Sequence, residues 1–331
     1  MALLSVRDLS VTFAGGVAAV RDLSFTVDAG EVVGVVGESG SGKTATALAV
    51  LGLLPRSAVV GGSVWWKGSP MSAAAVRGRE VGMVFQEPVS SLNPVRTAGA
   101  QVAEVLRVHE GLGRRAAADR AAELLAMVGL RSPSSYPHEL SGGMCQRAMI
   151  AMAIACGPDL LIADEPTTAL DVTVQAQVLD VLARVRSELG MAMLLITHDL
   201  GVVAGVADRV VVMYAGSHVE VGAVDDVFGS PRHPYTAGLL ASLPSLVGGG
   251  PLVGIGGTPP SPTALPPGCP FHPRCELRRL PSPCATDRPD LRLIEGADHY
   301  AACHFSEELR NVSAEHLRAK ASFVDRGDVS E

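Results

Sequence analysis

The eight residues GESGSGKT, from Gly37 to Thr44, determine how this sequence is expected to fold. They follow the apolar run VVGVV at 32–36 and precede the helix-forming run ATALAVLGLL at 45–54. Glycines in such a loop let successive backbone N–H groups converge on a β-phosphate, and the N-terminus of the helix adds its partial positive charge. The pattern predicts a nucleotide-binding loop between a buried strand and a helix.

Side chains within this loop have separate expected roles. Lys43 can reach the β- and γ-phosphates, and the Thr44 hydroxyl can ligate Mg²⁺. A Gly-rich turn that matches by chance is the alternative, and the flanking strand and helix argue against it. The remaining residues expected to contact the nucleotide are Gly37, Ser39, Gly40 and Gly42.

The composition is that of a globular chain, with 331 residues of which 47% are hydrophobic. A net charge of −7 provides no basic face for a nucleic acid, so we expect no nucleic-acid partner.

No apolar run reaches the ~20 residues that cross a bilayer, and the N-terminus lacks a signal-peptide pattern. We expect a cytosolic protein that serves a membrane only by docking on other chains.

Short β-branched runs alternate with longer helical patterns along the chain. After the strand at 32–36, the runs expected to form strands are 81–86, 160–164, 193–199 and 209–216. This alternation predicts an α/β fold with a mainly parallel sheet.

Three further regions depart from that alternation. Between about 88 and 158 strand patterns are absent and helical periodicity dominates, as at 115–130, so we expect an inserted helical subdomain. Glycine and proline become frequent near Gly248. We therefore predict a core at 1–245, a loop-rich extension at 246–310 and a disordered tail at 311–331.

The run LLIADEP ends a predicted buried strand in two adjacent carboxylates, Asp164 and Glu165. One can hold the magnesium shell, and the other can polarise a water for in-line attack on the γ-phosphate. Two acids at a strand end more often cap a helix. Their position after a nucleotide-binding loop favours the catalytic interpretation here.

The run LSGGM places Ser141, Gly142 and Gly143 at the start of a helical pattern. A hydroxyl and free backbone N–H groups at a helix N-terminus form a second anion site, separate from the first. A serine-capped helix is the simpler alternative, but it does not explain the two glycines. Two phosphate sites on one chain indicate a head-to-tail pair of chains, each completing the nucleotide site of the other.

These motifs, in this order, resemble the ABC ATPase family over residues 1 to 240. GESGSGKT matches the Walker A motif, LLIADE the Walker B motif and LSGGM the signature motif. The resemblance implies a P-loop ABC-type nucleotide-binding domain with a parallel sheet core, an antiparallel N-terminal β part and an inserted helical subdomain.

The resemblance also implies residue roles. Glu165 would be the catalytic base, His198 in LLITHD would contact the γ-phosphate, and Asp171 in the D-loop would communicate across the dimer. Phe13 would stack on adenine, although an aromatic residue in an early strand is more often core. Gln86 in VFQEP would link the magnesium site to the helical subdomain. The implied magnesium-site residues are Thr44, Gln86 and Asp164.

Longer stretches, QEPVSSLNP, YPHELSGGM, ADEPTTALDVTVQAQ and PRHPYTAGLL, resemble the ATPases of dipeptide, oligopeptide and nickel importers. The resemblance implies an ATP-hydrolysing subunit at the cytoplasmic face of a membrane, with two transmembrane permease subunits. A second ATPase subunit, a paralogue or a second copy, and an extracytoplasmic substrate-binding protein would complete the assembly. A nickel importer and a soluble ABC ATPase without a transport role are the alternatives.

The extension carries four of the six cysteines in the chain: Cys269, Cys275, Cys284 and Cys303. Thiolates select zinc or iron–sulfur clusters. The spacing lacks a CxxC pair, which weakens the case for zinc. The segment resembles the C-terminal cysteine motif of peptide-importer ATPases, which implies a [4Fe–4S] cluster. Zinc, free thiols and disulfides remain open.

Overall fold

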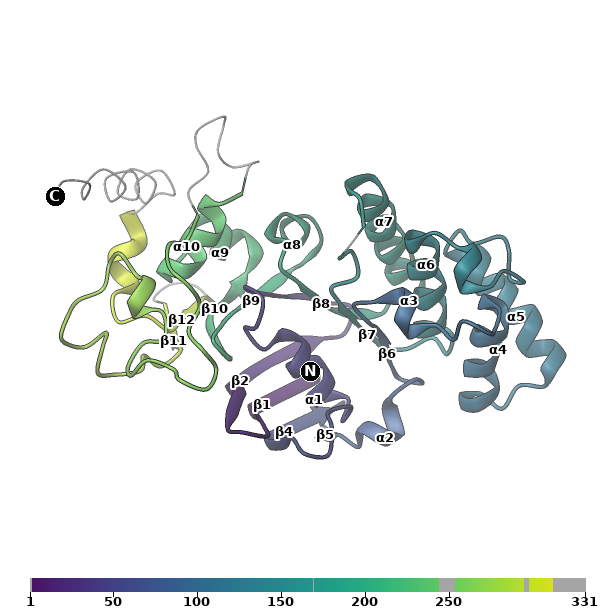
Figure 1. The fold of residues 1–331 in the computed structure, drawn as a ribbon, viewed down its shortest axis with the longest axis horizontal. Coiled ribbons are helices and arrows are strands. Elements are labelled where there is room, and N and C mark those ends of the chain that lie inside the picture. Colours follow the sequence, from purple (N-terminus) through teal and green to yellow (C-terminus); the bar gives the residue numbers. More distant parts are fainter. Residues whose placement is uncertain (1, 169, 244–253, 295–297, 312–331) are drawn as a thin grey trace.

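The computed structural model describes residues 2–168, 170–243, 254–294 and 298–311 of the chain. Figure 1 shows the sheets in the middle of the molecule, helices α3 to α7 at one end and the segment after α10 at the other. The strands are β1 (Ala2–Phe13), β2 (Val17–Asp28), β3 (Val32–Val36), β4 (Val59–Trp66), β5 (Ser69–Pro70), β6 (Val81–Val84), β7 (Leu160–Asp164), β8 (Ala192–Thr197), β9 (Arg209–Tyr214), β10 (Ser217–Ala223), β11 (Arg292–Leu293) and β12 (Tyr300–Ala301).

Helices connect most of these strands, as a parallel sheet requires. They are α1 (Lys43–Val50), α2 (Ala73–Val76), α3 (Pro88–Ser91), α4 (Ala98–His109), α5 (Arg114–Met127), α6 (Gly142–Ala153), α7 (Val172–Leu189), α8 (Leu200–Val206), α9 (Val224–Gly229) and α10 (Pro234–Ala241). None of the helices in the described ranges combines the length and the apolar character that a bilayer crossing needs.

The larger sheet has the strand order β11-β12-β10-β9-β3-β8-β7-β6. Its strands from β9 to β6 run parallel to one another. Every residue of β3, β7 and β8 is buried, because layers on both faces of the sheet cover them. The predicted α/β fold with a mainly parallel sheet is confirmed.

Three strand predictions extend two residues too far at their C-terminal ends. The strands end at Val84, Thr197 and Tyr214, whereas the predicted runs ended at 86, 199 and 216. The extra residues leave the strand ladders and form loops at the carboxyl edge of the sheet.

The N-terminal strands form a second, antiparallel sheet with the order β2-β1-β4-β5. Buried residues of β1 such as Leu4 and Val11 share a hydrophobic core with Val35 of β3 and Ile162 of β7. This sheet therefore covers one face of the parallel sheet. The antiparallel N-terminal part that the resemblance implied is confirmed.

Helices α3 to α6 lie between β6 and β7 in the chain. Their buried residues, such as Val102, Leu124 and Ile150, belong to a core that also includes Val84 of β6 and Leu195 of β8. The helix predicted at 115–130 corresponds to α5. All four helices fall inside the range predicted for the helical subdomain, and the limits of that subdomain remain a prediction.

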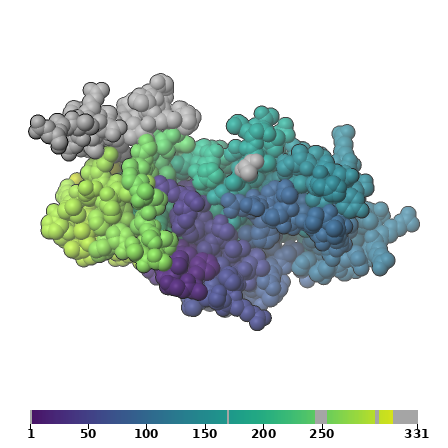
Figure 2. All heavy atoms as spheres, viewed as in Figure 1, coloured from purple at the N-terminus to yellow at the C-terminus, as the bar shows by residue number. Residues whose placement is uncertain are grey.

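The extension is more closely joined to the core than the sequence suggested. Strand β12 pairs with β10, so the extension continues the larger sheet, and Figure 2 shows it packed directly against the core. The carboxylate of Glu220, fully buried in β10, accepts bonds from the backbone N–H groups of Arg232 (2.6 Å) and His233 (2.9 Å). His299 Nε2 lies 2.7 Å from Glu220 Oε1. The boundary predicted at 245 and residues 312–331 of the predicted tail lie outside the described residues.

Candidate active site

The loops that carry the predicted site follow strands that are neighbours in the larger sheet. The strands β3, β8, β7 and β6 are adjacent and parallel, so their carboxyl ends meet at one edge. Open α/β sheets bind ligands at that edge. Residues from distant parts of the sequence therefore converge there.

The P-loop, residues 37–44, follows β3 and holds its lysine in place. The buried Lys43 donates from Nζ to the carbonyl oxygens of Gly37 (2.8 Å) and Glu38 (3.0 Å). Burial lowers the pKa of Lys43, and the charges of nearby carboxylates act in the opposite direction. Gly42 has φ of 101°, and a Cβ there would lie 2.3 Å from the carbonyl oxygen of Ala19. Only glycine fits this position.

The carboxylate of Glu165 lies at the centre of the site. Its Oε2 accepts hydrogen bonds from Gln86 Nε2 (3.1 Å) and Thr168 Oγ1 (2.7 Å). His198 Nδ1 is 3.4 Å from the same oxygen, and Lys43 Nζ is 3.9 Å from Oε1. Groups predicted from three other motifs, namely Gln86, His198 and Lys43, are thus within reach of one carboxylate.

The backbone of Glu165 is unusual as well. It has φ of 45°, in the left-handed region that side chains other than glycine rarely adopt. Its N–H donates to the carbonyl oxygen of Ile196 at 2.8 Å, which fixes the turn after β7 against β8. Such conformations gather at functional sites.

Asp164 and Thr44 form the oxygen-rich part of the site. Thr44 Oγ1 donates to Asp164 Oδ1 at 3.2 Å. Asp164 is buried, and this burial raises its pKa to about 6, with the neighbouring Glu165 charge acting in the same direction. A divalent cation would favour its ionised form.

The signature residues form a separate helix start. Ser141 caps α6, its Oγ accepting from the N–H of Met144 at 3.3 Å, and Gly142 and Gly143 are the first helical residues. Within the described parts of the chain, no hydrogen bond or ion pair links these residues to the P-loop. Within one chain, the signature residues and the P-loop are therefore not brought together.

Asp171 caps α7, accepting from the N–H of Val174 at 3.0 Å.

Close packing of α6 against α7 requires the second signature glycine, because a Cβ at Gly143 would lie 2.4 Å from Val174 Cγ1. The D-loop residue Ala169 lies outside the described residues.

Phe13 ends β1 opposite Val17 and packs, half-buried, against the N-terminal core. This environment agrees with a core role, and the side chain is only partly buried. The predicted stacking on adenine stays a prediction.

Sequence reasoning missed Thr168 and the contacts of Glu38. Thr168, three residues after Glu165, could have been noticed, since a side chain at that spacing in a turn reaches back. Glu38 pairs with Arg274, which lies 236 residues away, and no local pattern indicates that pair.

The cysteines of the extension line one cavity, together with Phe271. Burial raises the pKa of Cys275 and Cys303 to about 12 and raises that of Cys269 as well. Every cysteine in the described residues is a free thiol. In these same ranges, no three His, Cys, Asp or Glu side chains are grouped so that they could hold a single metal ion. The cysteines that line the cavity are Cys269, Cys275, Cys284 and Cys303.

Comparison with known families agrees with this geometry. The profile described as "ABC transporter" matches residues 20–168, and that described as "Oligopeptide/dipeptide transporter, C-terminal region" matches residues 219–281.

Relatives match over most of the chain. The oligopeptide transport ATP-binding protein OppD of Mycobacterium tuberculosis is 52% identical over 94% of this chain and 53% of its own length. The chain thus spans about half the length of this mycobacterial relative. The protein of the same name from Salmonella typhimurium is 49% identical over 82% of this chain and 86% of its own length.

Solved structures share the fold. CbiO1 of Clostridium perfringens, part of the ABC transporter complex CbiONQ, has a TM-score of 0.60 at 25% identity and covers 69% of this chain and 91% of its own. The ATP-binding cassette MJ0796, in a dimeric post-hydrolysis state bound to ADP and Pi, has a TM-score of 0.60 at 27% identity, covering 67% and 98%.

Replacing Glu165 by the isosteric glutamine tests the centre of this site. We expect Glu165→Gln to lower the rate of ATP hydrolysis by at least about 100-fold, because it removes the carboxylate on which Gln86, Lys43 and His198 converge. Nucleotide binding, measured by equilibrium titration, should persist. Glu188→Gln, at an exposed carboxylate near the end of α7, is the matched control and should hydrolyse ATP normally. Normal turnover in Glu165→Gln would remove this residue from the reaction.

Proposed function

The chain belongs to the ABC transporter family and carries the C-terminal region of its oligopeptide/dipeptide branch, and from this premise we propose that it is the ATP-hydrolysing subunit of a peptide importer. The observation that carries the proposal is the convergence of Gln86, Lys43 and His198 on the carboxylate of Glu165.

Family membership implies ATP and Mg²⁺, and the residues fit both. Thr44 and Asp164 supply hard oxygen donors 3.2 Å apart, the type that Mg²⁺ prefers. Gln86 donates a hydrogen bond to Glu165, the residue that follows Asp164. Lys43 would contact the β- and γ-phosphates. Glu165 would take a proton from the attacking water as the new P–O bond forms and the bond to the β–γ bridging oxygen breaks.

Hydrolysis would require two chains. The signature residues Ser141, Gly142 and Gly143 have no contact with the P-loop of their own chain in the described residues, so they are available to the nucleotide of a second ATPase subunit. That subunit is a paralogue or a second copy. Asp171, at the start of α7, would lie near the same interface.

A groove next to the site is suited to a membrane partner. Residues from β6, α3, α4 and α6 line it, and Phe85 is 39% exposed at its edge. Phe85 directly precedes Gln86, which contacts Glu165. We propose that cytosolic helices of two permease subunits dock here, so that closure of the ATPase pair is transmitted to the membrane. Such docking would put the chain at the cytoplasmic face of the membrane.

Peptides are the proposed cargo because relatives that are 52% and 49% identical to this chain over the aligned residues are named for oligopeptide transport. An extracytoplasmic binding protein would select them. A nickel importer and an ABC ATPase without a transport role are the alternatives, and neither has an observation in its favour here.

Isolation of the chain from its native membranes in mild detergent tests the proposal. We expect mass spectrometry to identify two multi-span subunits and a second ATPase in stoichiometric amounts, because the docking groove and the signature face both need partners. An extracytoplasmic peptide-binding protein should be encoded with them. Recovery with ribosomal or DNA-repair proteins instead would contradict transport.

We also propose that the four cysteines of the extension hold a structural [4Fe–4S] cluster. These four cysteines line one cavity, and the donor set is the soft one that such clusters use. Each cysteine of a cluster binds a different iron, so its four sulfurs need not be grouped around one ion, as the ligands of zinc must be.

Anaerobic purification tests the cluster. We expect brown protein with about four irons and four sulfides per chain. Cys275→Ser should lose the visible absorption and unfold at a lower temperature, whereas Cys156→Ser, outside the extension, should retain both. Colourless protein containing zinc, or no metal, would rule the cluster out.

A further inference from the structure

A buried arginine of the extension contacts the P-loop directly. Arg274 lies in GCPFHPRC, next to Cys275, and donates from Nη1 to Glu38 Oε2 (2.7 Å) and from Nη2 to Glu38 Oε1 (3.0 Å). The Arg274 side chain is 5% exposed and that of Glu38 is 26% exposed. Two parallel bonds between a guanidinium and a carboxylate fix the orientation of both groups.

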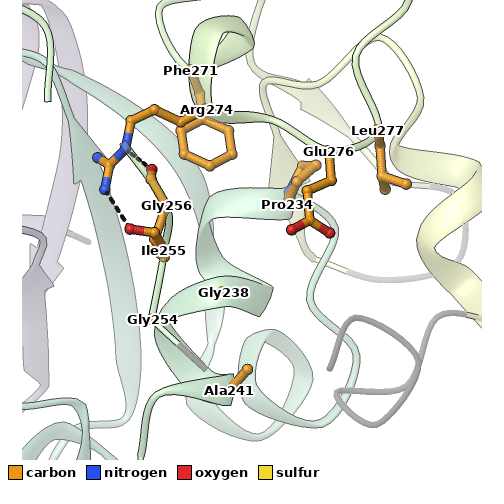
Figure 3. A pocket seen from close by; sticks show the side chains of 10 residues that line it. All are labelled: Pro234, Gly238, Ala241, Gly254, Ile255, Gly256, Phe271, Arg274, Glu276 and Leu277. Carbon is orange, nitrogen blue, oxygen red and sulfur yellow. Dashed lines mark hydrogen bonds between the residues drawn. The ribbon is translucent and has the colours of Figure 1, made fainter. Parts of the chain in front are cut away.

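The remaining donors of Arg274 are also used. Nε donates to the carbonyl oxygen of Gly256 at 2.9 Å and Nη2 to that of Ile255 at 3.3 Å, and Figure 3 shows both bonds. Nη1 also donates to Tyr214 Oη at 3.3 Å. An arginine has five N–H donors, and each of these has an acceptor within reach. The guanidinium therefore cannot turn away from Glu38 without breaking bonds inside the extension.

Glu38 is held at its backbone as well. Its N–H donates to Tyr235 Oη at 2.8 Å, and its carbonyl oxygen accepts from Lys43 Nζ at 3.0 Å. A shift of Glu38 would therefore move a group that positions the phosphate-binding lysine. Its carboxylate, without a counter-charge, would also place a negative charge beside a site for a triphosphate.

We propose that Arg274 is a positioning residue for nucleotide binding, which neutralises and orients Glu38 so that the P-loop accepts a triphosphate. The inference rests on the proposed ATP-binding function. It gives the extension a second role besides packing, because the same segment that carries the cysteines sets the affinity of the P-loop for ATP.

Variants of the pair distinguish this role from simple packing. Arg274→Gln should raise the Kd for Mg·ATP roughly tenfold, a usual size for coupling between two sites. The double variant Glu38→Gln/Arg274→Gln removes the unneutralised carboxylate and should recover most of the affinity. Arg274→Lys keeps the charge but not the paired bonds and should fall between.

Arg279→Gln is the matched control. Arg279 makes a paired contact with Glu308 inside the same extension, at 2.7 and 2.6 Å, and does not contact the P-loop. We expect this variant to bind Mg·ATP as the unmodified chain does, since an exposed ion pair contributes little.

Titration of Mg·ATP onto each purified full-length variant, with thermal unfolding recorded in parallel, decides the matter. Folded Arg274→Gln with unchanged affinity, or a double variant at least as weak as Arg274→Gln, would overturn the inference. If Arg274→Gln does not fold, Arg274→Lys decides: weaker binding at an unchanged unfolding temperature supports the inference, and unchanged binding contradicts it. An unmodified chain that binds no ATP would instead contradict the proposed function itself.

Discussion

The carboxylate of Glu165 accepts hydrogen bonds from Gln86 and Thr168 where parallel strands of the sheet end, and the other parts of the site are arranged around it. The left-handed backbone at Glu165 costs about 1–3 kcal/mol, and the bond from its N–H to Ile196 holds it in place. The strands behind it, β7 and β8, are buried along their whole length. A reacting water and a γ-phosphate could thus meet a carboxylate that is already positioned.

The extension contacts the P-loop and helps to hold it in place. Arg274 of the extension supplies two hydrogen bonds to the Glu38 carboxylate. Here β12 continues the sheet, the Glu220 and His299 side chains join the two parts, and Arg274 reaches Glu38. The extension has little regular structure, and these buried polar contacts hold it to the core. Each polar group in them has a hydrogen-bond partner, which avoids the cost of an unpaired buried group.

Much of the fold could be predicted from the sequence, because strands buried on both faces appear as continuous apolar runs such as LLIAD at 160–164. The P-loop and the acid pair were recognisable since their chemistry depends on neighbours in the chain. The strand ends were less exact; after Val84, for example, Phe85 continues the apolar run although the ladder has stopped. Strand β12 has two residues, too few for any periodicity, and the pairing of Glu38 with Arg274 depends on tertiary structure alone.

Peptide uptake by proteoliposomes that contain the chain and its co-purified membrane subunits tests the central claim most directly. We predict that a labelled oligopeptide crosses the membrane when Mg·ATP is supplied on the side of the ATPase and stays outside with Mg·ADP. ATP hydrolysis by the same assembly without any movement of peptide would contradict peptide import, while leaving the nucleotide chemistry of the site intact.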